Sequence, residues 1–183
     1  MNATQKVHWS DGRHITKMCV LFVAILMLCG AFSPYQWNGS SSVPIGLYRV
    51  RYGRPEVGEL IAFCLPKEVA LYAKARGYIG FGFSCPGWTQ PLLKPVVAVA
   101  GDAITIAPSA VTVRGFALSN TQVFETDSQG RPHEISMEYG SHMVPSDMVF
   151  VLSAFHERSW DSRYFGFVPI TNILSTMEPL WTW

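Results

Sequence analysis

An uninterrupted apolar run near the N-terminus, "MCVLFVAILMLCGAF" from Met18 to Phe32, constrains the fold of this chain more than any other feature. The run is apolar on every side rather than along one stripe, which disfavours a helix packed on a soluble core. A spanning helix needs about 20 apolar residues, and the uncharged residues flanking the run lengthen it toward that value. We therefore expect a transmembrane helix over residues 18–33 and a separate folded domain after it.

Positive charge is concentrated before this run. Lys6, Arg13 and Lys17 precede it, and few basic residues follow closely. Because positively charged flanks stay on the cytoplasmic side, residues 1–17 are expected in the cytoplasm, and residues 34–183 are expected beyond the membrane.

Two cleaved signals are alternatives to an uncleaved signal-anchor. A secretory signal peptide has similar charge and length, but Cys29-Gly30-Ala31 is a mediocre small-residue cleavage site. A lipoprotein signal needs a small residue before its cysteine, and Leu28 precedes Cys29. The signal-anchor is the interpretation that we favour.

The rest of the chain has the composition of one globular domain. Of the 183 residues, 49% are hydrophobic and 15% are charged, which argues against disorder. No repeat or second linker divides the segment, so one domain is expected from about Tyr35 to Trp183, after a polar connector "SPYQWNGSS". The net charge of +1 gives no reason to expect nucleic-acid binding.

Short apolar segments bounded by turn residues predict a mostly β domain. One helix is expected within Val69–Gly80, ending near Gly77, and the tail over residues 169–183 is expected to return as a strand or short helix. The pattern indicates a folded sheet or partly open barrel with one or two short helices. The expected strands are Gly46–Arg51, Leu60–Phe63, Ala103–Ala107, Val111–Arg114 and Asp147–Phe155, with a further apolar stretch at Pro91–Ala100.

The four cysteines divide between the two parts of the chain. Cys19 and Cys29 lie in the apolar run, where inert small hydrophobic side chains are expected. Cys64 and Cys85 lie in the exported part, where an oxidising compartment favours a disulfide between them. Metal binding is not expected, because the chain has no CxxC pair and no histidines at ligand spacing.

Three serines, Ser40 to Ser42, run directly into the strand-like segment "VPIGLY". A catalytic serine needs a constrained turn with backbone N–H groups near the developing oxyanion. Small residues followed by Pro44 supply such a turn. The simpler alternative is a serine-rich connector.

Lys94 is the only charged residue between Pro91 and Ala100. Its ammonium either extends along the apolar surface to reach water or is buried. Burial lowers the pKa of a lysine, and a neutral amine can act as general base to a serine hydroxyl.

Asp161 and Arg163 lie two residues apart, so on an extended segment they would share a face and form an ion pair. The pair could simply anchor a loop. In a functional interpretation, the carboxylate orients the lysine or shapes its pocket.

Three segments, "SSSVPIGLY", "LLKPVVAVAGD" and "SWDSRYFGFV", follow one another in this order. They resemble the signature boxes of the S26 signal peptidases, and the serine box Ser-x-Pro-x-Gly-Leu-Tyr is most similar to that of the conjugative-transfer members. Each box alone is a weak signal, but their order and spacing and the apolar run upstream make the combination specific.

The resemblance implies a role for each matching residue. Ser42 matches the nucleophile, Lys94 matches the general base, and Asp161 matches an acidic position used as a third catalytic member in conjugative-transfer enzymes. Ser40 matches a hydroxyl that helps to form the oxyanion hole. Pro95 departs from the family, which usually has arginine there, and its missing N–H predicts that Lys94 lies at a sheet edge or bulge.

The resemblance also implies a function. It suggests a single-pass enzyme of the bacterial inner membrane with its catalytic domain in the periplasm and no cofactor. The expected substrate is an exported precursor, above all a conjugative pilin, released by hydrolysis or by cyclisation, with other conjugation machinery as further partners. The alternatives are a general type I signal peptidase and a non-catalytic subunit of a conjugation or type IV secretion assembly. A triad based on His156 is disfavoured because no nucleophile-elbow motif accompanies it.

Overall fold

The computed structural model describes residues 14–22, 33–133 and 137–183. The chain separates into two compact units, Met1–Pro34 and Tyr35–Trp183. In the first unit, residues 14–22 are helical. Most of the predicted transmembrane segment, residues 18–33, falls outside the described residues, and no helix within them is both long and apolar enough to cross a bilayer. The membrane anchor therefore stays a prediction.

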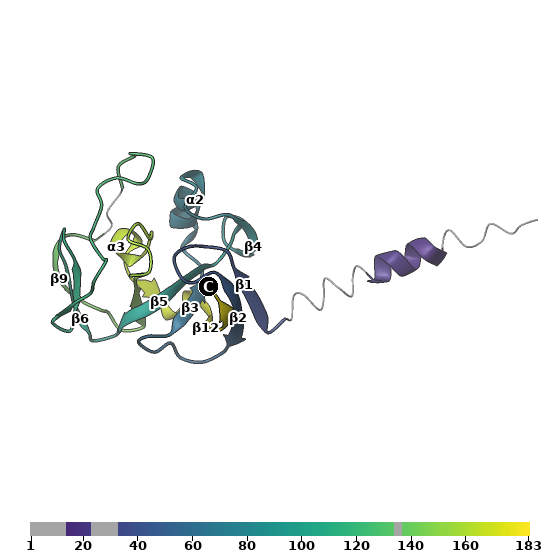
Figure 1. The fold of residues 1–183 in the computed structure, drawn as a ribbon, viewed down its shortest axis with the longest axis horizontal. Coiled ribbons are helices and arrows are strands. Elements are labelled where there is room, and N and C mark those ends of the chain that lie inside the picture. The colour runs from purple at the N-terminus through teal and green to yellow at the C-terminus, as the bar shows by residue number, and fades with distance from the viewer. Residues whose placement is uncertain (1–13, 23–32, 134–136) are drawn as a thin grey trace, which may run out of the picture. The chain divides into compact units, whose positions relative to one another are not determined.

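The second unit is built on a seven-stranded antiparallel sheet (Figure 1). The last strand of the chain lies between the second and third strands, so it joins the N-terminal hairpin to the rest of the sheet. In spatial order the strands are β1 (Tyr35–Asn38), β2 (Gly46–Arg51), β12 (Ile173–Thr182), β3 (Leu60–Phe63), β5 (Leu92–Val99), β10 (Met148–Val151) and β11 (Val168–Pro169).

A second, four-stranded sheet continues from β5. The chain turns at Gly101, whose φ of 87° favours glycine, and enters the small sheet, toward which β5 runs in Figure 1. In spatial order its strands are β8 (Phe116–Ala117), β7 (Val111–Val113), β6 (Ala103–Ile106) and β9 (Gly140–Met143). The predicted β6–β7 hairpin is present, with Ile104 opposite Val113.

Helices are few, so the predicted mostly β class is confirmed. Helix α2 (Lys67–Ala75) begins earlier than predicted, directly after Pro66, and ends near Gly77 as predicted, since Gly77 follows the cap residue Arg76 with φ 75°. The others are the one-turn helix α3 (Ser162–Phe165) and the 3₁₀ turn η1 (Ile170–Asn172).

The main hydrophobic core is built around the central strands of the large sheet. Ile61 of β3, Val96 of β5 and Phe150 of β10 belong to it and are at most 1% exposed. Burying side chains of this size contributes roughly 1.5–3 kcal/mol each, so this core fixes the register of the central strands.

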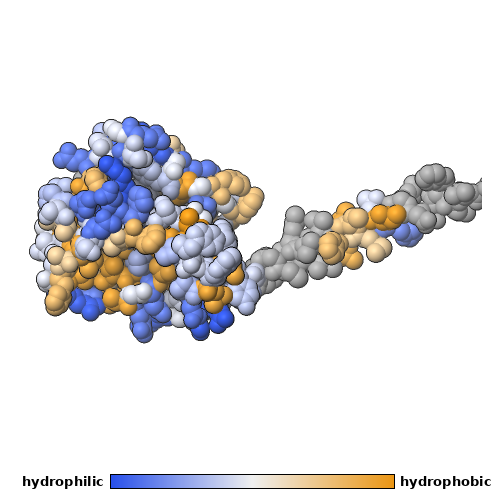
Figure 2. All heavy atoms as spheres, viewed as in Figure 1, coloured by the Kyte–Doolittle hydropathy of each residue, from blue (hydrophilic) through white to orange (hydrophobic). Residues whose placement is uncertain are grey.

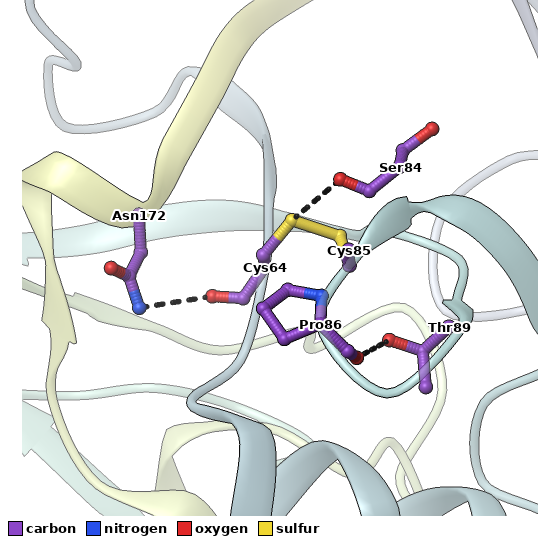
Figure 3. Close-up of a disulfide and its surroundings, with 6 residues drawn as sticks. All are labelled: Cys64, Ser84, Cys85, Pro86, Thr89 and Asn172. Atoms are coloured by element: carbon purple, nitrogen blue, oxygen red, sulfur yellow. Dashed lines mark hydrogen bonds between the residues drawn. A yellow bond between two sulfur atoms is a disulfide. The ribbon is translucent and has the colours of Figure 1, made fainter.

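A disulfide joins Cys64 and Cys85, as the sequence analysis expected (Figure 3). Cys64 follows β3, and Cys85 ends β4 (Phe81–Cys85), so the bond fastens the α2–β4 segment to the sheet. Asn172 secures the same point, because its side chain donates to the Cys64 carbonyl at 3.2 Å (Figure 3).

The prediction of a polar connector over residues 33–41 is wrong in part. Four of its residues form β1, which pairs with β2 from Tyr35 opposite Arg49 to Asn38 opposite Gly46. The serine cluster therefore lies in a hairpin loop rather than in a tether.

Of the two positions expected from Pro95, a sheet edge or a bulge, Lys94 does not lie at an edge, but a bulge follows on the same strand. Its strand is interior, and the Pro95 carbonyl still accepts the Leu152 N–H at 3.1 Å. The irregularity lies further along, where Val151 pairs with Val96 but Phe150 pairs with Ala98. β5 thus accommodates the proline by a bulge placed after it.

An aromatic ridge projects from the β4 hairpin and is formed by Phe81, Phe83 and Trp88. The Phe81 and Phe83 rings are 4.9 Å apart and the Phe83 and Trp88 rings 5.9 Å apart, and all three side chains are exposed. Figure 2 shows apolar side chains protruding where Figure 1 places β4.

Candidate active site

The predicted nucleophile, Ser42, lies in the hairpin loop between β1 and β2. The strands pair up to Asn38 and Gly46, which leaves residues 39–45 as the loop. Ser42 is half-buried, whereas the neighbouring Ser41 is exposed. The loop thus holds one of its serines against the body of the domain.

Asn38 holds this loop from the inside. Its buried side-chain amide donates to the carbonyls of Ser40, Val43 and Pro44 at 3.0, 3.3 and 3.1 Å. Its Oδ1 accepts the N–H and the hydroxyl of Ser40 at 3.1 and 2.9 Å. The Ser40 hydroxyl, predicted to serve the oxyanion hole, is therefore bonded to Asn38 in this structure.

The C-terminal strand presses against the base of the loop. Gly46 has φ 151°, and a Cβ there would lie 2.0 Å from the Trp181 carbonyl oxygen. The Trp183 N–H donates to the Ile45 carbonyl at 3.0 Å. Glycine in the serine box is thus required by the close approach of β12.

Lys94 projects from the middle of β5 into a buried position. It pairs with Ile61, so it shares the face of the main core, and it is only 3% exposed. Burial lowers the pKa of its ammonium from the usual 10.5 to about 8, against the opposing effect of the Asp161 carboxylate, and Arg163 lowers it further. About a tenth of Lys94 is therefore the free amine at pH 7, far more than for an ordinary lysine.

Ser159 joins the lysine to the serine. Lys94 Nζ donates to Ser159 Oγ at 2.8 Å, and Ser159 Oγ lies 3.3 Å from Ser42 Oγ within a hydrogen bond. The three polar atoms form a continuous chain in which the hydroxyl protons can point either way. Our sequence analysis missed Ser159, although it opens the third signature box.

Asp161 and Arg163 form the predicted ion pair, and both are 0% exposed. Arg163 Nε and Nη2 each lie 2.8 Å from a carboxylate oxygen, and the same carboxylate caps α3 through the Arg163 N–H. Arg163 Nη2 also donates to the Ser159 carbonyl at 2.9 Å. The expected extended segment is therefore replaced by a helix cap, and the pair fixes the loop that carries Ser159.

Ser153 links the carboxylate to the backbone of the nucleophile. Its N–H donates to Asp161 Oδ2 at 3.1 Å, and its hydroxyl donates to the Ser42 carbonyl. It is 0% exposed. Predicting it was difficult because a polar residue ending the buried stretch "VFVLS" reads as an ordinary strand end.

Ser42, Lys94 and Ser159 border a cleft of about 490 Å³. Its walls come from β1 and the serine loop, from residues 90–94, and from His156 with residues 158–160. Gln90 also contacts the aromatic ridge hairpin, since a Cβ on Gly82 would lie 2.8 Å from the Gln90 backbone. A buried amine and a bridged hydroxyl at one wall of a cleft can carry out nucleophilic attack with general-base assistance.

The chain is similar to several known proteins. Residues 12–182 match the family described as "Signal peptidase, peptidase S26". A probable conjugal transfer protein TraF from Sinorhizobium fredii is 39% identical over 155 residues, 83% of this chain and 79% of the relative. A plasmid transfer protein TraF from Escherichia coli is 34% identical over 164 residues, 87% and 91% of the two chains. A solved signal peptidase I from Enterococcus faecalis aligns with a TM-score of 0.41 and 22% identity, covering 68% of this chain and 97% of that one.

Proposed function

Because the chain belongs to the S26 signal peptidase family, we propose that it is a serine endopeptidase that processes exported precursor proteins through Ser42 and Lys94. The conjugal and plasmid transfer names of its relatives support a precursor used in conjugation, with a pilin as the first candidate. The apolar run before the domain supports an inner-membrane anchor with the cleft in the periplasm.

The hydrogen-bonded chain from Lys94 through Ser159 to Ser42 is the observation that carries this proposal. As Ser42 Oγ attacks the scissile carbonyl carbon, its proton passes to Ser159 Oγ while the Ser159 proton passes to neutral Lys94 Nζ. The Lys94 ammonium that results gives a proton to Ser159 Oγ, and Ser159 gives its own proton to the leaving amine as the scissile C–N bond breaks.

The developing oxyanion needs donors on the other side of the carbonyl. We assign the Ser42 N–H to this role, with the Ser40 hydroxyl after it turns away from Asn38 Oδ1. Asn38 keeps the loop in place during this movement because its amide still holds three loop carbonyls.

The acyl-enzyme has two possible acceptors. Attack by water gives a linear product, whereas attack by an amine of the substrate itself gives a cyclic product lighter by one water. In both cases the attacking acceptor gives a proton to Lys94 through Ser159 while it bonds to the acyl carbon. The bond from that carbon to Ser42 Oγ then breaks, and Ser42 Oγ takes the proton back from Lys94 through Ser159. The exposed aromatic ridge beside the cleft would suit a precursor that carries an apolar segment.

The test is processing of the pilin precursor of the chain's own conjugation system in cells that carry wild type, Ser42→Ala or Lys94→Ala. We expect precursor to persist in both variants and mature pilin to form in wild type, with the product mass separating linear from cyclic pilin. Ser119→Ala, at an exposed serine outside the cleft, is the matched control and should process normally.

The same experiment separates the rival functions. Normal processing by Ser42→Ala at wild-type membrane levels would refute the proposed nucleophile and favour a role in assembly. Processing of many unrelated exported precursors would instead identify a general type I signal peptidase.

A further inference from the structure

The side chains of the cleft that can be charged near neutral pH are all basic. In the described part of the chain, the lining contains Lys94, Arg158 and His156 and no Asp or Glu. Lys94 is buried and donates a hydrogen bond to Ser159, so its amine belongs to the hydrogen-bonded chain that leads to Ser42. Arg158 is therefore the permanent positive charge of the cleft.

Arg158 is held in place without a carboxylate partner. Its guanidinium lies 4.2 Å from the centre of the Phe124 ring, and Nη1 donates to the Thr126 carbonyl at 3.2 Å. Within residues 14–22, 33–133 and 137–183, no carboxylate forms an ion pair with it. The side chain is exposed, and a guanidinium has more N–H donors than this one contact uses.

His156 adds a second donor beside it. Its Nδ1 accepts the backbone N–H of Arg158 at 3.2 Å, so the ring proton of the neutral form lies on Nε2. The Ser159 N–H donates to the His156 carbonyl at 2.9 Å, which closes a tight turn next to the serine chain. The intervening Glu157 accepts from Gln122 at 3.0 Å and does not line the cleft.

We propose that Arg158 and His156 form a subsite for a substrate carboxylate close to the scissile bond. A carboxylate there receives two charge-assisted hydrogen bonds from the guanidinium and one from the imidazole Nε2–H. Its source is an acidic side chain or the C-terminal carboxylate of a short leaving peptide. A lysine or arginine at the same position meets like charge, so the subsite selects against basic residues. This inference rests on the proposed endopeptidase function.

The experiment uses the purified full chain and matched peptides that carry Glu, Gln or Lys in turn at each position from three before to three after the scissile bond. We expect one position at which kcat/KM follows Glu over Gln over Lys, with Glu favoured over Gln by about fivefold, as for a partly exposed ion pair. Arg158→Gln should remove this preference, and Arg158→Glu should reverse it in favour of Lys. Peptides ending with a free acid or an amide distinguish a terminal carboxylate from a side chain.

Binding of the same peptides to Ser42→Ala, measured by fluorescence anisotropy, tests the subsite independently of cleavage. The order of dissociation constants should follow Glu, Gln, Lys at the same position and become uniform in Ser42→Ala/Arg158→Gln. Arg54→Gln, which removes an exposed charge outside the cleft lining, should leave the preference unchanged.

Two results would overturn the subsite: no position with a charge preference in binding, or a preference that Arg158→Gln leaves intact. Ser42-dependent cleavage of neutral peptides alongside either result would leave the proposed peptidase standing. Charge-selective binding by a chain that cleaves no peptide would support the subsite and contradict the peptidase.

Discussion

At the scale of single residues, Lys94 occupies a position that its strand otherwise fills with apolar side chains. Its lowered pKa predicts how activity depends on pH. Since the free amine is the base, kcat/KM should rise with pH through a midpoint at about 8 and level off above it. Lys94→Arg should abolish the activity at every pH, because a guanidinium does not lose its proton. A pH–rate profile on a peptide substrate checks this, and a flat profile from pH 6 to 9 would contradict it.

The same burial predicts that replacing Lys94 by an apolar residue stabilises the fold although it abolishes activity. The pKa of Lys94 is about 8 when folded and 10.5 when unfolded, so the unfolded chain binds more protons between these values. The destabilisation is complete below pH 8 and disappears as pH rises through 10.5. Lys94→Met should therefore raise the free energy of unfolding at pH 7 by roughly 2–3 kcal/mol while abolishing activity. Urea titrations at pH 7 and pH 10 measure this, with a smaller gain expected at the higher pH.

Two buried serines should differ in how they affect catalysis. Ser159→Ala breaks the chain between Lys94 and Ser42, so we expect kcat to fall by on the order of a hundredfold and the pH midpoint to move. Ser153→Ala loses its bond to the Ser42 carbonyl, and within the described residues no hydrogen bond joins Ser153 to Lys94, so kcat should fall about tenfold with the midpoint unchanged. Paired pH–rate profiles separate them. Equal shifts of the midpoint in both variants would show that Ser153 acts on the lysine as well.

Residue chemistry explains why the sequence analysis found only part of this site. The turn and the lone charge in an apolar strand made Ser42 and Lys94 candidates, and the resemblance to the signal-peptidase signature boxes then assigned their roles. Ser153, Ser159 and Asn38 were missed because each is an unremarkable polar residue in sequence. Their roles come from contacts across the fold, such as that between Ser159 and a serine in another hairpin.

At the scale of elements, Asp161 caps the N-terminus of α3, and its contacts predict that it holds neighbouring site residues in place. In the described residues its carboxylate hydrogen bonds go to Arg163 and to the Ser153 N–H, and none reaches Ser42 or Lys94. Asp161→Ala leaves a buried guanidinium unpaired and should lower the free energy of unfolding by about 3–5 kcal/mol.

The matched variant is Asp161→Ala/Arg163→Met, which removes both charges. It should recover most of the lost stability in a urea titration, and part of the activity with it. Full stability of Asp161→Ala together with complete loss of kcat would instead identify the carboxylate as a direct participant in catalysis.

Strands that carry the core could be predicted from sequence, and those that depend on a partner could not. β2 and β3 have the predicted bounds because apolar positions and flanking turns define them locally. β1 was missed since "YQWN" has no apolar alternation and is a strand only because β2 provides its hydrogen bonds. The predicted strand over Asp147–Phe155 ends at Val151 because the ion pair draws the following residues into the site loop.

At the scale of the whole molecule, the disulfide ties the cleft wall to the sheet. Cys64→Ala/Cys85→Ala opens a loop with a sequence separation of 21 and should lower the free energy of unfolding by about 3 kcal/mol. KM should rise more than kcat falls, since residues 90–92 line the cleft whereas pairing with β3 holds Lys94. Thermal unfolding and steady-state kinetics check both effects, with Cys19→Ala as the control. An unchanged KM would show that the wall keeps its shape without the bond.

The position of β12 between β2 and β3 also sets the order in which the large sheet can be assembled during synthesis. In the described residues β2, which follows the serine loop, has no direct pairing with β3 and is joined to it through β12, whose residues 176–182 pair with β2. A chain whose synthesis has not reached β12 therefore has no strand pairing between the hairpin that carries Ser42 and the strands around Lys94. The order of synthesis thus places completion of the large sheet, and with it assembly of the site, after every other strand has been made.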